Sequence, residues 1–328
     1  MGAVASTLMR ISKTAVSFEV RGFRGQNEPI RPHLEGVGGA FVDGYNRALE
    51  IDDLGRLEEV LEAQLPRPLT GFGYEGATMA VALADWAFPW RRPRLRRFVE
   101  GPAARHIYLA YVGIGWAIAR WPFGRNRRLA RLDPLMRWLA YDGIGFHEAF
   151  FRTAKTVERH EIPRWVEGYG RRAFDQGLGR SLWFVEGAGA ERIPARIAGF
   201  PAERRADLWS GVGLACAYAG GVGDEALDAL AKSAGPYRAE MAQGVVFAVR
   251  ARVQAGNPTT DLVRAARRVC GLGVDEAERL AVEAGLDLPT EGPVPGYEVW
   301  RARLHDWYRK EKGVDRWTRS CVSSAATA

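Results

Sequence analysis

The sequence predicts an all-α fold, because its apolar residues follow a helical period and its glycines recur at helical spacing. Leu54, Leu57 and Leu61 are three and four residues apart, and the segments 132–139 and 227–231 repeat this spacing. No segment sustains the alternation of apolar and polar residues that is typical of a strand. Small residues recur every four positions, as in Gly76 and Ala80. A glycine within a helix costs about 1 kcal/mol relative to alanine, so we expect these glycines to let neighbouring helices approach closely.

Four short motifs occur twice in the same order, which predicts an internal duplication. Their offsets are 133, 135, 134 and 128 residues. The matched residues are Phe41, Gly44, Arg47 and Leu49 with Phe174, Gly177, Arg180 and Leu182; Tyr74 and Gly76 with Trp209 and Gly211; Gly101 with Gly235; and Gly143 and Gly145 with Gly271 and Gly273. We therefore expect two helical lobes related by a pseudo-two-fold axis, with a cleft at their interface.

The motif pairs divide the chain into five parts. An N-terminal segment (1–22) precedes the first helical half (23–155), a polar linker (156–169) and the second half (170–288). The remaining residues, 289–328, are expected to form a helix from about Tyr297 to Lys312 and then a disordered tail, because Pro293 and Pro295 interrupt the preceding pattern.

The composition favours a soluble cytoplasmic protein. Apolar residues make up 47% of the 328 positions, enough for a sizeable core. The longest nearly apolar stretch, Ile107 to Ala119, is shorter than the roughly 20 residues that span a bilayer. The N-terminus lacks the apolar core of a secretory signal. The three cysteines are far apart and form no CxxC motif, which argues against a disulfide framework and against a zinc site.

The net charge of +7 comes almost wholly from arginine, which is concentrated in segments 91–97 and 125–131. A GC-rich genome favours arginine codons and is one explanation of these runs. The other is an anionic ligand or an acidic partner protein. No nucleic-acid-binding motif accompanies the arginines, so we expect no nucleic-acid partner.

Polar residues are concentrated in the first half, which predicts that this half holds the site. The candidates for acid–base catalysis are Tyr141, Asp142, His147, Glu148 and Glu75, where the second copy has Val269, Cys270, Asp275, Glu276 and Ser210. A histidine titrates near neutral pH and suits proton transfer. We expect these five residues to gather around one aromatic cavity.

Each candidate also has a structural interpretation. His147 is explained equally by a core position in which a backbone carbonyl satisfies the ring, and Asp142 by a helix N-cap. Glu75 either caps the first turn of a helix or faces an apolar cleft, where its pKa would be raised. Arg180 matches Arg47 of the other half, which favours a structural role for both.

Aromatic residues next to glycine suggest a pocket for a flat conjugated ligand. The candidate binding residues are Tyr74, Trp116, Trp183 and Trp209, and a well-packed helical core is the alternative explanation. His147-Glu148 and His160-Glu161 lack the HExxH spacing, and no carboxylate cluster for magnesium is present. Walker, GxSxG and dinucleotide-binding motifs are absent too. We expect neither a metal nor an organic cofactor.

Several long strings make the sequence resemble a bacterial family of unknown function whose members are often described as enediyne biosynthesis proteins. The strings are GFGYEGATMAVALADW, YLAYVGIGWAIARWP, LAYDGIGFHEAFF, RRAFDQGLGRSLWFVEGA and RRADLWSGVGLACAYAGGV. The resemblance extends from about Val20 to Tyr308. The resemblance implies that the protein is encoded beside the polyketide synthase that makes a linear polyene. It does not identify any catalytic residue.

Two functions follow from the resemblance and the candidate residues. The first is an accessory enzyme that isomerises, cyclises or otherwise rearranges a hydrophobic polyene-derived intermediate by acid–base chemistry. The alternative is a non-catalytic protein that binds the polyene or docks on the polyketide synthase or its carrier domain, with the arginine runs facing the acidic partner.

Overall fold

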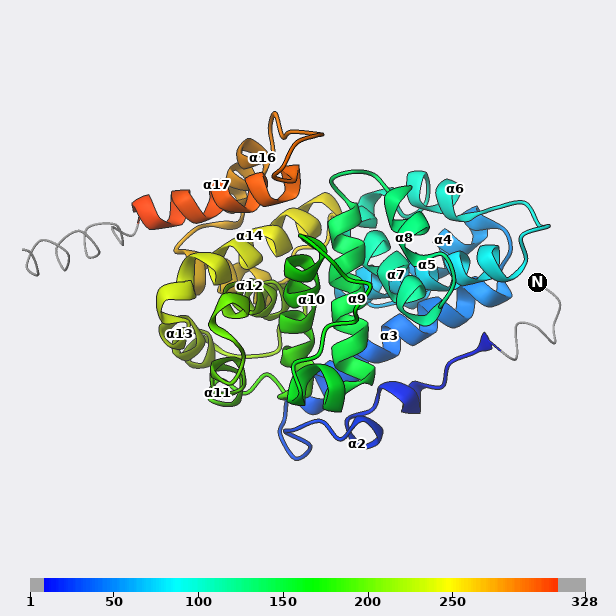
Figure 1. Cartoon of the computed structure of the whole chain (residues 1–328). Coiled ribbons are helices and arrows are strands. Elements are labelled where there is room, and N and C mark those ends of the chain that lie inside the picture. The colour runs from blue at the N-terminus through cyan, green and yellow to red at the C-terminus, as the bar shows by residue number, and fades with distance from the viewer. Residues whose placement is uncertain (1–8, 312–328) are drawn as a thin grey trace, which may run out of the picture.

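The computed structural model describes residues 9–311, and these residues form helices and no strand. The all-α prediction is therefore confirmed for the described part of the chain. The long helices lie side by side, and shorter helices cover their ends and outer faces (Figure 1).

Seven long helices form a row in which each helix packs against the next one along the chain. They are α3 (Arg31–Glu50), α5 (Thr70–Ala87), α7 (Ile107–Arg120), α9 (Arg137–Phe151), α10 (Gly170–Val185), α12 (Ala202–Tyr218) and α14 (Arg238–Gln254). The row curls back on itself. The His33 ring of α3 lies 2.7 Å from the carbonyl oxygen of Ala219 after α12, and Arg252 of α14 donates to the Pro68 carbonyl before α5. The inner faces of the helices therefore surround a common centre.

The helices touch through glycine, as the sequence predicted. In α7, α9, α10 and α12 the motif Gly-x-Gly places one glycine against the preceding helix of the row and the other against the following helix. In α9, a Cβ on Gly143 would lie 2.2 Å from the Val112 carbonyl oxygen of α7, and a Cβ on Gly145 would lie 1.9 Å from that of Phe174 on α10. Any side chain at these positions would collide with backbone, so only glycine allows this spacing.

The remaining elements are short. They are η1 (Lys13–Val16), α2 (Phe18–Arg21), α4 (Leu54–Gln64), η2 (Arg67–Leu69), α6 (Leu95–Glu100), η3 (Ala104–His106), α8 (Arg125–Ala130), η4 (Ala154–Glu158), α11 (Arg192–Ala198), α13 (Asp224–Ser233), η5 (Gly235–Tyr237), α15 (Thr260–Ala265), η6 (Ala266–Cys270), α16 (Val274–Ala284) and α17 (Gly296–Glu311). Three of them position the site. The N-terminal segment with η1 and α2 crosses one end of the row, and α17 packs on α14 and α16 at the other (Figure 1).

The predicted duplication and its pseudo-two-fold relation are not confirmed. Gly44 and Gly177 both lie within long helices of the row, but Gly143 lies in the middle of α9 whereas Gly271 ends η6 with a φ of 73°. The unit that visibly recurs is a single helix with its glycine pair. The boundary at 156–169 separates α9 from α10, which pack closely, and residues 1–8 and 312–328 of the outer segments lie outside the described residues.

Candidate active site

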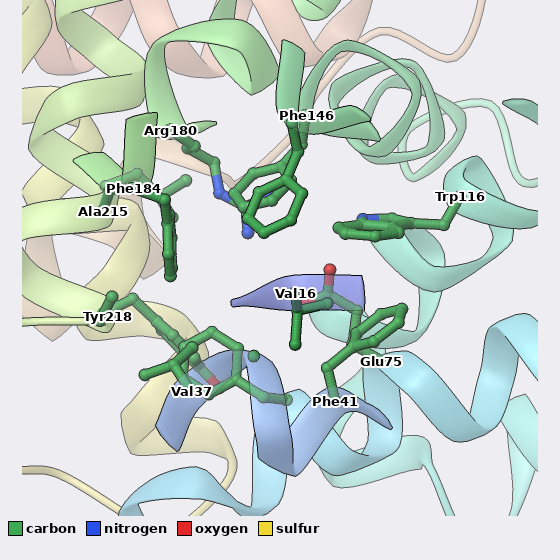
Figure 2. A pocket seen from close by; sticks show the side chains of 15 residues that line it. Val16, Val37, Phe41, Glu75, Trp116, Phe146, Arg180, Phe184, Ala215 and Tyr218 are labelled. Carbon is green, nitrogen blue, oxygen red and sulfur yellow. The ribbon is translucent and has the colours of Figure 1, made fainter. Parts of the chain in front are cut away.

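The register of the glycine pairs decides which side chains face the centre. Successive residues of an α-helix point about 100° apart, so the two glycines of Gly-x-Gly face opposite sides. The residue after the second glycine points inward. These residues are Trp116, Phe146, Arg180 and Leu214, from four successive helices of the row, and all four line one central cavity. Figure 2 shows the first three around this cavity.

The cavity is small and predominantly aromatic, and most of the side chains that line it are buried. Its volume of about 40 Å³ has room for about three water molecules. The rings that line it are Phe41, Phe72, Trp116, Phe146, Phe150, Phe184 and Tyr218. Val16 of η1 closes one side and lies 3.1 Å from where a Cβ on Gly38 would stand. We call the segment Ile11–Phe23, which includes Val16, the N-terminal strap.

Among the described residues, Glu75 supplies the only carboxyl group in the cavity lining. It lies in the middle of α5 and is 3% exposed, and in Figure 2 its carboxyl group points toward the space between Trp116 and Arg180. Burial raises the pKa of Glu75 to about 8, although the charge of Arg180 opposes this shift. The raised pKa, to which the Asp142 charge also contributes, keeps most of this carboxyl group protonated at neutral pH.

Arg180 is the second ionisable group in the cavity lining. It is 5% exposed, forms a buried ion pair with Asp142 of α9, and its guanidinium carbon lies 5.2 Å from the centre of the Phe146 ring. Burial opposes the charge of Arg180, but the Asp142 carboxylate raises its pKa, so the guanidinium stays charged. Because Asp142 balances this charge, Glu75 faces an ion pair and not an isolated cation.

A belt of buried polar side chains continues from this pair. Its members are Asp142, Gln176 and Ser210, which stand directly before the first glycine of the motifs in α9, α10 and α12, and Gln243, which stands before Gly244 of α14. Gln176 donates to Asp142 at 2.8 Å, and Ser210 donates to Gln243 at 2.8 Å. Gln243 in turn accepts from Arg301 of α17 at 3.0 Å. The belt thus connects the cavity to the C-terminal helix and fixes the position of Arg180.

A second cavity of about 30 Å³ adjoins the first. Arg180, Leu214 and Tyr218 line both, so they form the partition between them. Its other walls come mainly from α7, α9 and α14, and Tyr297 and Trp300 of α17 close it. The Tyr218 hydroxyl is buried and has no hydrogen-bond partner among the described residues.

The family model described as "Protein of unknown function (DUF1702)" matches residues 1–308. The chain belongs to this family. Neither a curated protein nor a solved structure shows significant similarity to it. The family description names no reaction, so the function of this DUF1702 member has to be argued from its own site.

Of the five predicted acid–base residues, only Glu75 lines the cavity of this DUF1702 protein. Asp142 lies outside the lining and forms an ion pair with Arg180, which lines the cavity. The N-cap interpretation of Asp142 is wrong, because the residue lies inside α9 and its carboxylate accepts from side chains of α10. Tyr141 is half-buried, stacks on Trp138 with ring centres 5.5 Å apart, and lies away from the cavity.

His147 and Glu148 lie beside the cavity wall. His147 is buried, its ring meets Trp116 edge to face with centres 5.6 Å apart, and burial lowers its pKa. Its Nδ1 lies 3.4 Å from Oε1 of Glu148. Burial opposes the Glu148 charge, yet the contacts with His147 and Arg152 lower the pKa of this carboxyl group overall. The arrangement matches the core-histidine interpretation, except that a carboxylate and not a carbonyl faces the ring.

Among the predicted binding residues, Trp116 lines the cavity and the others pack elsewhere. Trp183 is fully buried and donates to the Gly220 carbonyl at 3.1 Å. Trp209 is buried outside both cavity linings. Tyr74 stacks on His106 with ring centres 4.3 Å apart and donates to Glu62. For these three residues the structure shows core packing.

Sequence reasoning assigned Arg180 a structural role shared with Arg47 and missed its place in the cavity. The two arginines occupy different environments, since Arg47 is 45% exposed and pairs with Glu50 at the surface. The signal that identifies Arg180 is its position directly after a Gly-x-Gly motif, which it shares with Trp116 and Phe146.

Within residues 9–311 no group of three or more His, Cys, Asp or Glu side chains is arranged to hold a metal ion. In the same part of the chain, every helix is too short or too polar to cross a bilayer.

Proposed function

We propose that this protein is an accessory biosynthetic enzyme that binds a hydrophobic unsaturated molecule in the central cavity and protonates it with Glu75. The observation that supports the proposal is a buried carboxylic acid with a pKa of about 8 in a predominantly aromatic cavity. A carboxyl group that stays protonated at neutral pH serves as a general acid.

The proton transfer needs no redox partner. The electron pair of a carbon–carbon double bond takes the Glu75 proton and forms a C–H bond, and the neighbouring carbon becomes a cation. Loss of a proton from the next carbon to the Glu75 carboxylate moves the double bond and restores the acid. Attack by a second double bond instead closes a ring before the proton is lost. Both outcomes are isomerisations without net oxidation.

The cavity walls are suited to the cation that forms. Trp116, Phe146 and Phe41 present π systems, which attract cations in a water-poor site. The Arg180 charge is balanced by Asp142, so it repels the developing cation less than an unpaired guanidinium would. Once Glu75 is ionised, Arg180 stabilises the carboxylate until it recovers a proton.

The resemblance to proteins of enediyne clusters narrows the proposed ligand to a polyene or polyketide-derived intermediate. Such a molecule exceeds the 40 Å³ of the closed cavity. Binding therefore requires side chains to move, and the N-terminal strap is the cover whose displacement exposes the cavity.

The second candidate function is a non-catalytic polyene-binding protein, which the strongly apolar lining of the cavity also favours. The two candidates differ in their dependence on Glu75. A binding protein needs the shape of this side chain, whereas the enzyme needs its proton.

The deciding experiment measures carbon protonation in deuterated water. The protein is incubated with polyene extracted from a strain that carries the cognate polyketide synthase but lacks this gene, and deuterium on carbon is followed by mass spectrometry. We expect Glu75→Gln to lower the rate of incorporation by roughly 10² to 10⁴ while the polyene still binds. The matched control is Glu148→Gln, a buried carboxyl on α9 outside the cavity, which should incorporate deuterium normally. Equal incorporation with and without wild-type protein, together with polyene binding, would favour the binding role.

A further inference from the structure

Two aromatic side chains protrude from the surface near the arginine runs. Trp90 is 77% exposed and Phe123 is 72% exposed, more than any other large apolar side chain among the described residues. Trp90 lies in the loop between α5 and α6, and Phe123 lies in the loop between α7 and α8. In Figure 1 the cyan loop after α5 projects from the end of the molecule that α4 to α8 build.

The two loops adjoin through a row of aromatic rings. Trp121 bridges them, because its ring centre lies 6.3 Å from that of Trp86 at the end of α5 and 6.3 Å from that of Phe123. Arg128 connects the same residues, since its guanidinium carbon lies 4.0 Å from the Trp86 ring centre and its Nε donates to the Phe123 carbonyl. These contacts hold the loops in place and leave the two ring tips in solvent.

Four arginines on these segments make no ion pair with any described residue. They are Arg92, Arg97, Arg127 and Arg131, all exposed. The nearby carboxylates are engaged elsewhere: Asp52 pairs with Arg91 and Arg94, Glu100 pairs with Arg96, and Asp85 accepts from backbone amides at the start of α6. Phe123 lines a surface hollow with Arg127 and Arg131, and Arg92 lines another with Arg97. We call these four arginines with Trp90 and Phe123 the arginine–aromatic face.

We propose that the arginine–aromatic face docks the protein on an anionic lipid surface. Aromatic side chains on protruding tips insert at the boundary between lipid headgroups and acyl chains. Unpaired arginines beside them attract anionic headgroups, at about 1 kcal/mol each near the surface. The phosphates of a nucleic-acid duplex would use the arginines but would leave the two apolar tips exposed, because the bases of a duplex are already stacked on one another. The lipid surface accounts for both features.

Vesicle binding tests the proposal. The full-length protein should sediment with vesicles of equimolar phosphatidylcholine and phosphatidylglycerol, and should remain in solution with vesicles of phosphatidylcholine alone. Raising the salt concentration should weaken the binding, because the attraction is partly electrostatic. The double variant Trp90→Ser/Phe123→Ser and the double variant Arg127→Gln/Arg131→Gln should each bind at least about 10-fold more weakly.

Matched surface variants distinguish this face from general charge and apolarity. Leu286→Ser/Val294→Ser removes two exposed apolar side chains elsewhere, and Arg267→Gln/Arg279→Gln removes two exposed positive charges elsewhere. Both should bind like the wild type. The proposal is overturned if the wild type ignores anionic vesicles at low salt, or if control and face variants bind equally. It is equally overturned if the face variants lose binding to an acidic carrier protein while the wild type shows no affinity for vesicles.

Discussion

Replacing Glu75 with glutamine is expected to change how the stability of the protein depends on pH. In the unfolded chain this carboxyl group loses its proton near its ordinary pKa of 4.5, whereas in the folded protein it keeps the proton up to about pH 8. As the pH rises from 4.5 to 8, ionisation of Glu75 therefore stabilises the unfolded state, whereas the folded state keeps the proton and is not stabilised in this way. Wild-type stability falls across this window, and a glutamine at position 75, which does not titrate, removes this contribution.

The magnitude follows from the two pKa values. Each pH unit between them corresponds to about 1.4 kcal/mol, so the Glu75 contribution reaches about 5 kcal/mol at pH 8 and disappears below pH 4.5. Relative to the wild type, Glu75→Gln should gain stability progressively with pH. Guanidinium unfolding at a series of pH values and constant ionic strength measures the difference.

Glu148→Gln provides a control of opposite sign. The folded-state pKa of Glu148 is lowered, so its ionised form stabilises the protein above pH 4.5 and this contribution is lost as the pH falls through the folded-state value. The control should therefore be less stable than the wild type at neutral pH and should approach it in acid. Parallel curves for the wild type and Glu75→Gln between about pH 5 and about pH 8 would refute the argument, because they would show that the buried carboxyl group does not retain its proton.

Four further predictions concern His147, Asp142 and two glycines. His147→Gln should cost about 1 to 3 kcal/mol of stability and leave deuterium incorporation unchanged, since the ring lies outside the cavity lining; a large loss of incorporation in a stable variant would contradict this. Asp142→Asn should leave the Arg180 charge unbalanced and thereby lower the pKa of Glu75. The pH range over which stability falls should then end at a pH below 8, which the same unfolding series measures. Gly177→Ala should cost more than about 3 kcal/mol, because its Cβ would lie 1.7 Å from the Asp142 carbonyl oxygen. Gly36→Ala, with open space around it, should gain about 0.5 to 1 kcal/mol in thermal unfolding.

The all-α class and the glycine contacts could be predicted from the sequence because both depend on local period. A spacing of three and four reports a helix wherever it occurs, and a repeated glycine in such a pattern indicates a close neighbour. Glu75 and Trp116 could be selected because a carboxyl group and a large ring next to glycine are unusual in an apolar helix. Their meeting in one cavity depends on how the row of helices curls, which no local pattern encodes.

The failed expectations have a common physical cause. A motif such as GIGFHEAFF shows which residue types are near one another along the chain but not which side of the helix each one faces. Asp142 and His147 are five residues apart, so they point in different directions, and only Asp142 reaches Arg180. The offset of about 133 residues suggested two large halves. Four steps along the row of helices, from Gly44 of α3 to Gly177 of α10, produce the same offset, so spacing alone could not tell these cases apart.

The glycine pairs also restrict how the protein can adapt to different ligands. The glycines of each central helix lie against the backbone of both neighbouring helices. The row of helices therefore cannot widen without breaking these contacts. Room can be gained only along the central axis, through the partition formed by Arg180, Leu214 and Tyr218 and toward the ends closed by Val16 and α17. Such an architecture fixes the width of the ligand that the cavity accepts, whereas the length of the ligand can vary. Relatives that keep the glycines should therefore differ in how long a chain they accept, and not in how broad a molecule they admit.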